Sequence, residues 1–141
     1  MTQVSCNILI DVSAESIWQV IGDLGAAGQY LAGVVTCTVV GEGAGARRTL
    51  TYTDGSTVIE RLEVLSAPAH QLSYLLLADT PFRNCLTTMT VRDLGASQAE
   101  LAWSATFEPD GLAASEAAAL LECALAANCQ ELKQFMEAGR K

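Results

Sequence analysis

The sequence predicts an α+β fold, in which a curved, seven-stranded antiparallel sheet surrounds a long C-terminal helix and two short helices follow the first strand. Three observations carry this prediction. Residues 4–10 alternate apolar and polar side chains, which is typical of a strand with one buried face. Six further β-rich segments follow with short connections, a pattern that favours an antiparallel meander. Residues 112–138 then contain many Ala, Leu and Glu and lack Gly and Pro, as a long helix does.

The first helix is expected directly after the first strand. Ser13 is placed to cap it, and Glu15 lies near its positive end, where an acidic side chain is favourable. Its apolar residues recur with helical spacing: Ile17, Val20, Ile21 and Leu24. A second short helix is expected over residues 26–31.

Threonine, valine, leucine and tyrosine dominate the middle of the chain in runs of about eight residues, the length of an ordinary strand. The predicted strands span 34–41, 46–53, 57–65, 71–78, 84–93 and 98–107. Asp54-Gly55 between two alternating runs is a strong hairpin signal. Pro109-Asp110-Gly111 ends the sheet, and Asp110 is expected to cap the final helix.

The final helix carries one apolar stripe, which predicts a cavity. Its members are Ala117, Leu121, Ala124, Leu125, Asn128, Leu132, Phe135 and Met136. The side chains of the stripe are small in the first and middle turns of the helix and large at its C-terminal end, so that the stripe tapers. Small side chains facing a curved sheet leave volume unfilled, and a void is costly in a core that serves stability alone. In the alternative interpretation, Tyr52, Tyr74 and Trp103 fill this space.

Strand alternation places two charged residues among the inward-facing side chains. Arg48 shares a face with Leu50 and Tyr52. Glu60 shares a face with the apolar residues of its strand, which are Val58, Leu62 and Val64. The turn at Asp54-Gly55 makes positions 48 and 60 close cross-strand partners. A buried charge must be paired or solvated. Two interpretations stay open: a structural ion pair, or a polar cluster with Tyr52 or Tyr74 that orients a ligand oxygen.

Composition disfavours several classes of partner. Sixteen acidic and eight basic residues give a formal net charge of -8, whereas nucleic acids and anionic membranes attract basic surfaces. No apolar run approaches the roughly 18 residues that span a bilayer, so no membrane span is predicted. The first residues contain no basic stretch of the signal-peptide kind, and a cytoplasmic location is expected.

Cysteine and histidine give no sign of a metal site or a cofactor. The five cysteines are odd in number and show no C-x-x-C pair, which favours free, buried thiols: Cys6, Cys37, Cys85, Cys123 and Cys129. His70 is the single histidine and is expected in a turn or at the surface. We therefore expect no metal and no cofactor.

Several short motifs, taken in their order and spacing, carry a family resemblance. They are Ile10-x-x-Ser13-x-x-x-Ile17-Trp18, Gly45-Ala46-Arg47-Arg48, Glu60-Arg61-Leu62, Trp103-x-x-x-Phe107 and the terminal helix. With them the chain resembles the START/Bet v 1-like (SRPBCC) superfamily and, within it, the polyketide cyclase/dehydrase-like branch. The resemblance implies one helix-grip domain over residues 1–141. It also implies a hydrophobic cavity for lipids, polyketides, hormones or other small ligands.

The leading functional hypothesis is a binding protein for a small hydrophobic ligand, such as a lipid, a polyketide or an aromatic molecule that bears an oxygen. The candidate ligand-binding residues are Tyr30, Arg48, Tyr52, Glu60, Tyr74, Trp103 and Asn128. A cyclase/dehydrase-type enzyme is the first alternative. For it the resemblance implies Arg48 with Tyr30 or Tyr52 as possible cavity groups, and no catalytic residue is assigned. A protein-interaction module is the second alternative. A homodimer is a possible assembly for which the sequence offers no residue-level argument.

Overall fold

The computed structural model describes residues 1–77 and 81–139. Its elements are β1 (Thr2–Ile10), α1 (Ala14–Ile21), the 3-10 turn η1 (Leu24–Ala26), α2 (Ala27–Tyr30), β2 (Val34–Val40), β3 (Arg47–Tyr52), β4 (Thr57–Ser66), β5 (Gln71–Leu76), β6 (Phe82–Asp93), β7 (Ala99–Pro109) and α3 (Ala114–Ala138). The order of elements matches the prediction. The strand predicted at 71–78 ends at Leu76, and its last predicted position lies outside the described residues.

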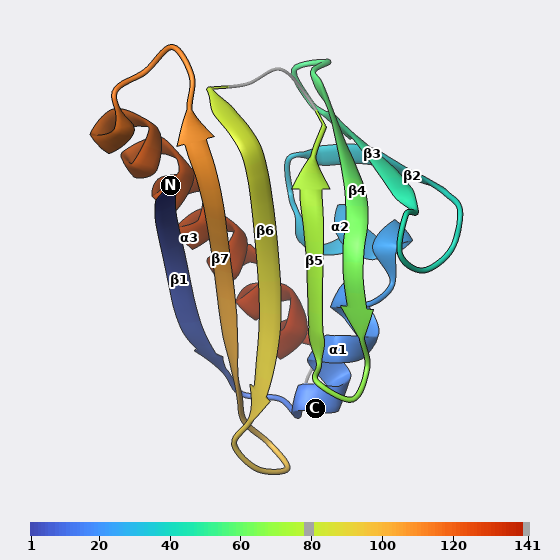
Figure 1. Ribbon diagram of the computed structural model, residues 1–141. Coiled ribbons are helices and arrows are strands. Elements are labelled where there is room, and N and C mark those ends of the chain that lie inside the picture. The colour runs from blue at the N-terminus through green and yellow to red at the C-terminus, as the bar shows by residue number, and fades with distance from the viewer. Residues whose placement is uncertain (78–80, 140–141) are drawn as a thin grey trace.

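The strands form one antiparallel sheet in the order β1-β7-β6-β5-β4-β3-β2. Strands β2 to β6 each pair with the next strand along the chain, whereas β1 pairs with β7. Figure 1 shows the curved sheet in front, with α3 running behind β1, β7 and β6 and the short helices behind β3 to β5. The predicted α+β fold is therefore confirmed: a curved antiparallel sheet, a long C-terminal helix and short helices after the first strand.

Two local signals in the sequence are confirmed. The Ser13 side chain caps α1 and accepts a hydrogen bond from the backbone N–H of Ser16 at 3.2 Å. Strands β3 and β4 form a hairpin at Asp54-Gly55, where Gly55 has a φ of +87°, a conformation that glycine adopts without steric cost. This hairpin fixes the register that places position 48 opposite position 60.

The predicted cap of the final helix is wrong. Helix α3 begins at Ala114, and its N-cap residue is Ala113, whose side chain makes no capping hydrogen bond. Gly111 turns the chain with a φ of +85°, so that Asp110 lies three residues before the N-cap position. An N-cap side chain must lie at the residue next to the first helical turn, and Asp110 is too far away to serve.

The buried face of α3 differs in part from the predicted stripe. Ala124 and Phe135 are exposed. Cys129, which was not part of the predicted stripe, is fully buried. Helix α3 packs mainly against β1 and β7, at one side of the sheet. In this position the buried residues of α3 are those that face the two strands: Ala117, Leu125, Cys129 and Leu132. The predicted taper of the stripe is therefore wrong at Ala124 and Phe135.

Strand β4 breaks its own alternation near its end. The register shifts between Leu62 and Val64, which face Tyr74 and Ser73 of β5, so that Glu63 is the extra residue of a bulge. Val64 therefore lies on the outer face and is exposed, in contrast to its predicted inward position. Glu60 and Leu62 precede the bulge and keep their predicted inward orientation.

His70 occupies a turn, as predicted, and its side chain contacts α1 at one end of the sheet. Its φ of +49° lies in the left-handed region, between β4 and β5. The imidazole stacks on Trp18 of α1, with ring centroids 5.6 Å apart, and its Nε2 lies 3.2 Å from a carboxylate oxygen of Glu15. Glu15 and Trp18 are three residues apart and lie on one face of α1, so the turn contacts this face at two positions.

All five cysteines are free thiols, as predicted, but only Cys85 and Cys129 are buried and Cys123 is exposed. The expectation of buried thiols is thus wrong for Cys123. No helix within residues 1–77 and 81–139 is long and apolar enough to cross a membrane.

Candidate functional site

The candidate site is centred on an ion pair inside the curved sheet. Arg48 of β3 and Glu60 of β4 are direct cross-strand partners and both face inward. Nε and Nη2 of Arg48 donate to the same oxygen, Oε1 of Glu60, at 3.0 and 2.6 Å. Arg48 is only 5 % exposed and Glu60 only 9 %. The predicted pairing of positions 48 and 60 is therefore present, and the pair is buried.

A backbone carbonyl also accepts a hydrogen bond from the guanidinium of Arg48. Nη1 of Arg48 donates to the carbonyl oxygen of Leu24 in η1 at 3.3 Å. The Cys37 thiol of β2 approaches the same oxygen at 3.4 Å. Sequence reasoning missed Leu24, since a carbonyl acceptor leaves no signature in the residue type. The contact links the short helical segment after α1 to the centre of the sheet.

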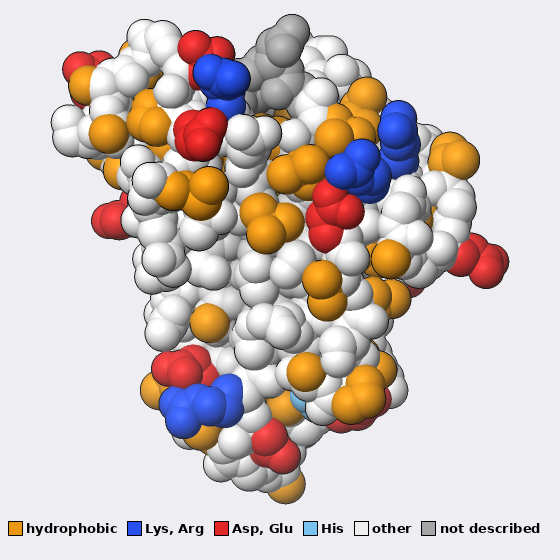
Figure 2. Space-filling view, viewed as in Figure 1, with side chains coloured by type: hydrophobic (Ala, Val, Ile, Leu, Met, Phe, Trp, Pro, Cys, Tyr) orange, Lys and Arg blue, Asp and Glu red, His pale blue; other side chains and the backbone are white. Residues whose placement is uncertain are grey.

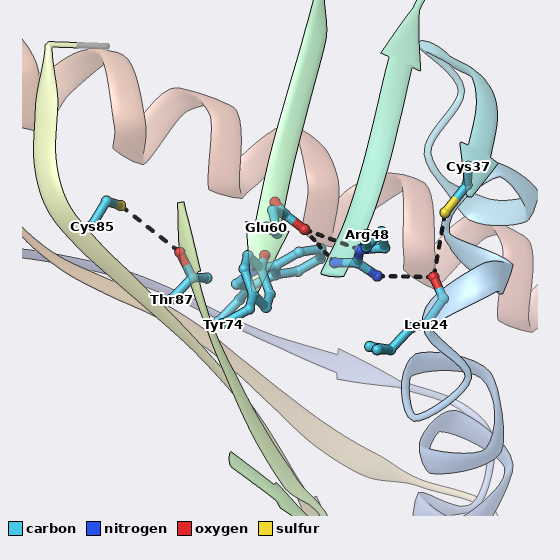
Figure 3. A network of polar contacts seen from close by, with 8 residues as sticks. Leu24, Cys37, Arg48, Glu60, Tyr74, Cys85 and Thr87 are labelled. Atoms are coloured by element: carbon cyan, nitrogen blue, oxygen red, sulfur yellow. Dashed lines mark hydrogen bonds and ion pairs between the residues drawn. The ribbon is translucent and has the colours of Figure 1, made fainter. Parts of the chain in front are cut away.

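Tyr74 of β5 lies against the ion pair and connects it to β7. The guanidinium carbon of Arg48 stands 5.2 Å from the centroid of the Tyr74 ring, within cation–π range. The indole Nε1–H of Trp103 donates to the Tyr74 hydroxyl at 3.2 Å. Figure 3 shows Arg48, Glu60 and Tyr74 pointing toward one another from three neighbouring strands, with the Leu24 carbonyl on the far side of Arg48.

Tyr30 and Tyr52 lie at the border of this cluster. Tyr30, the last residue of α2, is buried; burial raises the pKa of its hydroxyl, the charge of Arg48 lowers it and the charge of Glu60 raises it. Its ring also faces Phe135 of α3, with centroids 6.4 Å apart. Tyr52, the last residue of β3, is half-buried and has no hydrogen bond with Glu60 or Arg48. Burial raises the pKa of its hydroxyl, the charge of Glu60 raises it further and the charge of Arg48 lowers it. The structure thus brings both tyrosines near the ion pair, from two different elements.

Burial and charge act in opposite directions on the ionisable groups of the cluster. Burial by itself would lower the pKa of Arg48, but the Glu60 carboxylate, together with Tyr74 and Tyr30, more than offsets this and leaves the pKa above its usual value. Burial raises the pKa of Tyr74 well above its ordinary value, and the charge of Glu60 raises it further. Arg48 is therefore a permanent cation, and Tyr74 keeps its hydroxyl proton at neutral pH.

One carboxylate oxygen of the pair is left open. Both guanidinium contacts use Oε1 of Glu60, and no residue within 1–77 and 81–139 donates a hydrogen bond to Oε2. Fully enclosed polar side-chain atoms of these residues all have a partner. Oε2 is consequently accessible to a water molecule or a ligand atom, although Glu60 as a residue is buried. An accessible acceptor in an apolar interior can bind a donor group such as a hydroxyl.

A pocket of about 330 Å³ opens beside the cluster. It lies between the turn that contains Leu24 and the glycine-rich loop after β2, and it reaches Leu62, two residues along β4 from Glu60. A larger surface groove of about 670 Å³ lies elsewhere, where the C-terminal turn of α3 meets the β1–α1 connection and the β6–β7 turn. Of these two hollows, the smaller one is lined by Leu24, whose carbonyl accepts a hydrogen bond from Arg48.

Asn128 is the predicted site residue that the structure does not connect to the others. It is half-buried on α3, and no hydrogen bond joins it to the cluster within the described ranges. The remaining six predicted residues are grouped by direct contacts or by charge: Tyr30, Arg48, Tyr52, Glu60, Tyr74 and Trp103. Within residues 1–77 and 81–139, no group of three or more His, Cys, Asp or Glu side chains could hold a metal ion.

Comparison with known families identifies the chain at the level of a family. The family model described as polyketide cyclase / dehydrase and lipid transport matches residues 1–137. The chain belongs to this family. The predicted membership of the START/Bet v 1-like superfamily, in its polyketide cyclase-like branch, is thereby confirmed. No curated protein matches the chain significantly.

Several solved structures share the fold of this chain. XoxI from Bacillus cereus is 26 % identical, with a TM-score of 0.89 and complete coverage of both chains. The Zhui aromatase/cyclase from Streptomyces sp. R1128 is 17 % identical, with a TM-score of 0.77 and coverage of 97 % of this chain and 92 % of that one. Norcoclaurine synthase from Thalictrum flavum, solved with dopamine and hydroxybenzaldehyde, is 15 % identical, with a TM-score of 0.78 and coverage of 99 % and 88 %. The last two likenesses concern the fold alone.

Proposed function

We propose that the protein binds a small, mainly apolar molecule carrying at least one hydroxyl group, and that the cluster around Arg48 and Glu60 orients this hydroxyl. The observation that carries the proposal is the open Oε2 of Glu60 within a buried ion pair. A buried ion pair is a weak source of stability, because removing two charges from water costs about as much as their attraction returns. Its presence on the inner face therefore favours a role in binding.

The chemistry of the cluster defines the preferred ligand group. Oε2 of Glu60 can only accept, so it selects a donor. Arg48 has five N–H donors, of which three contact Glu60 and Leu24, so it can also donate to a ligand oxygen. A hydroxyl group satisfies both requirements at once. The surrounding side chains of Tyr74, Trp103 and Leu62 would contact the apolar part of the molecule.

An enzyme of the cyclase/dehydrase kind is the second candidate, and the arrangement of Arg48 and Tyr74 favours it. A fixed cation can stabilise an enolate oxygen, and a protonated tyrosine beside it can donate a proton. Because burial raises the pKa values of both Tyr30 and Tyr74, neither is suited to accept a proton at neutral pH. The reaction would therefore require Glu60 as the proton acceptor.

The first experiment asks whether the protein carries a ligand and whether a hydroxyl decides binding. Native mass spectrometry of the purified protein, followed by denaturing extraction, would identify a bound molecule. Calorimetry would then compare 2-naphthol with 2-methoxynaphthalene, which have the same rings but differ in the O–H donor. We expect 2-naphthol to bind about tenfold more tightly, the effect of one hydrogen bond to a charged group.

Two glutamates of β4 provide a matched pair of variants. Glu60→Gln keeps the shape of the inward side chain but turns its open end into an amide, and should abolish the preference for 2-naphthol. Glu63→Gln changes the outer face, where Glu63 pairs with Arg61 at 2.8 Å, and should leave the preference unchanged. Equal affinity for both naphthalenes in the unchanged protein, or an equal effect of the two substitutions, would contradict the proposal.

A further inference from the structure

The edge strand β2 has a self-complementary sequence. Residues 34–40 read Val-Val-Thr-Cys-Thr-Val-Val, which is the same in both directions from Cys37. The strand contains only β-branched residues and one cysteine, with no charge and no proline, a composition of high strand propensity. In an antiparallel pair with a two-fold axis at Cys37, each Thr36 would face a Thr38 and each Val35 a Val39. Such pairs of like β-branched side chains are favourable neighbours across strands.

The free side of β2 is uncovered. Val35 is 60 % exposed and Val40 76 % exposed, and Thr36 and Thr38 are exposed as well. Within the described ranges, no residue forms a hydrogen bond with a backbone group of 35–40 on the side away from β3. Figure 1 shows no element beyond β2 at this edge, apart from the loop that joins it to β3. The edge therefore offers unpaired N–H and C=O groups to a further strand.

The opposite edge of the sheet is protected. Lys133 of α3 donates to the carbonyl of Leu9 in β1 at 2.8 Å, and the Cys129 thiol approaches the carbonyl of Cys6. Proteins commonly protect edge strands with charged side chains or covering elements, because an open edge pairs with other chains. On β2 the one protective feature is the irregularity between Val34 and Thr36, at the first residues of the strand. The segment from Val35 to Val39 stays free to pair.

We propose that two copies of this chain associate through β2, antiparallel and about a two-fold axis at Cys37, and so join their sheets into one continuous sheet. A two-fold contact uses the same patch on both copies, and a palindromic strand satisfies this condition residue by residue. The copies keep their inner faces on the same side of the joined sheet. Each Arg48–Glu60 cluster therefore remains within its own copy, and the inference is independent of the proposed function.

The contact is small and its partners repel one another at long range. An edge-to-edge strand pair belongs to the low end of interface sizes, which is typical of transient association. Each copy has a formal net charge of -8, whereas residues 34–40 are uncharged. Added salt screens this repulsion without weakening backbone hydrogen bonds. We therefore expect the dimer to be concentration-dependent and to become more stable as salt increases.

Analytical ultracentrifugation tests the proposal with two matched variants. Thr38→Lys introduces a charge at the centre of β2, and Ser5→Lys introduces the same charge on β1, where Ser5 is likewise exposed on the outer face of an edge strand. From about 10 µM to about 1 mM, the range of weak interfaces, the unchanged protein and Ser5→Lys should dimerise alike. Thr38→Lys should raise the dimer dissociation constant at least tenfold, about 1.4 kcal/mol. A protein that stays monomeric throughout, or equal weakening by both substitutions, would overturn the proposal.

Hydrogen exchange on the unchanged protein provides a second test that does not depend on the folding of a variant. The amides of residues 35–39 that point away from β3 should exchange more slowly in the concentrated sample than in the dilute one, whereas amides of β1 should not change. Concentration-dependent protection on β1 without protection on β2 would place the contact at the other edge and overturn the proposal.

Discussion

The two halves of the sheet's inner face are built differently. Strands β1 and β7 lie under α3 and present apolar side chains that include Leu101, Ala105 and Phe107. Strands β3, β4 and β5 present Arg48, Glu60 and Tyr74. The half covered by α3 is therefore the more apolar one and provides the packing that stabilises the fold. The other half can then hold a buried charge pair with an open oxygen, at a cost that the first half offsets.

Truncation of a core side chain in the covered half should have the largest effect. Phe107 is fully buried, and its ring meets that of Phe82 edge-on at 5.2 Å. We expect Phe107→Ala to lower the free energy of unfolding by about 3–5 kcal/mol, because the ring leaves a cavity. Urea denaturation measures the change. Leu120→Ala, at an exposed position of α3, serves as the control and should cost less than about 0.5 kcal/mol. Similar costs at the two sites would refute the division into halves.

Removal of one partner of the charged pair should have the next largest effect. Arg48→Met leaves Glu60 buried without its cation, and we expect a loss of about 3 kcal/mol in the free energy of unfolding. The double variant Arg48→Met/Glu60→Leu removes both charges and should recover most of this loss, since a buried pair itself adds little stability. Denaturation of the single and double variants measures both values.

A control for this pair exists on the outer face, where Figure 2 shows acidic and basic side chains side by side over β4. Arg61 and Glu63 form an ion pair that is about one-third exposed on each side, so Arg61→Met should change the free energy of unfolding by less than about 1 kcal/mol. If the double variant at positions 48 and 60 were no more stable than Arg48→Met alone, the pair would contribute to stability in its own right.

Alkaline pH should produce the smallest of these effects on the free energy of unfolding, and the effect is absent at neutral pH. The pKa values of all three tyrosines are raised in the folded protein, in each case mainly through burial. Above a pH of about 10 the unfolded chain loses tyrosine protons that the folded chain retains, so stability falls as pH rises through this interval. A spectrophotometric titration of tyrosinate should show ionisation later in the native protein than in urea. If the tyrosines ionised at the same pH in the native protein and in urea, they would be exposed to water and the prediction would be wrong.

The pattern of the sequence was sufficient to predict the sheet and the charged pair. Alternation set the inward positions of Arg48 and Glu60, and Asp54-Gly55 fixed the hairpin register that makes them partners. Features that depend on tertiary packing were not predictable. The bulge at Glu63 reverses the alternation after Leu62, and the orientation of α3 depends on the two strands that it covers. The Leu24 carbonyl, finally, belongs to the backbone and has no counterpart in residue type.

The two tryptophans of the chain occupy unlike surroundings, and this has a practical consequence. Trp103 is hydrogen-bonded to Tyr74 beside the open carboxylate, whereas Trp18 lies in the middle of α1 and is stacked on His70. The chain therefore carries two natural fluorophores, one next to the candidate site and one next to its only imidazole. With Trp18 replaced by phenylalanine, the remaining emission would come from the site alone. Occupancy there could then be followed optically, without any label attached to the protein.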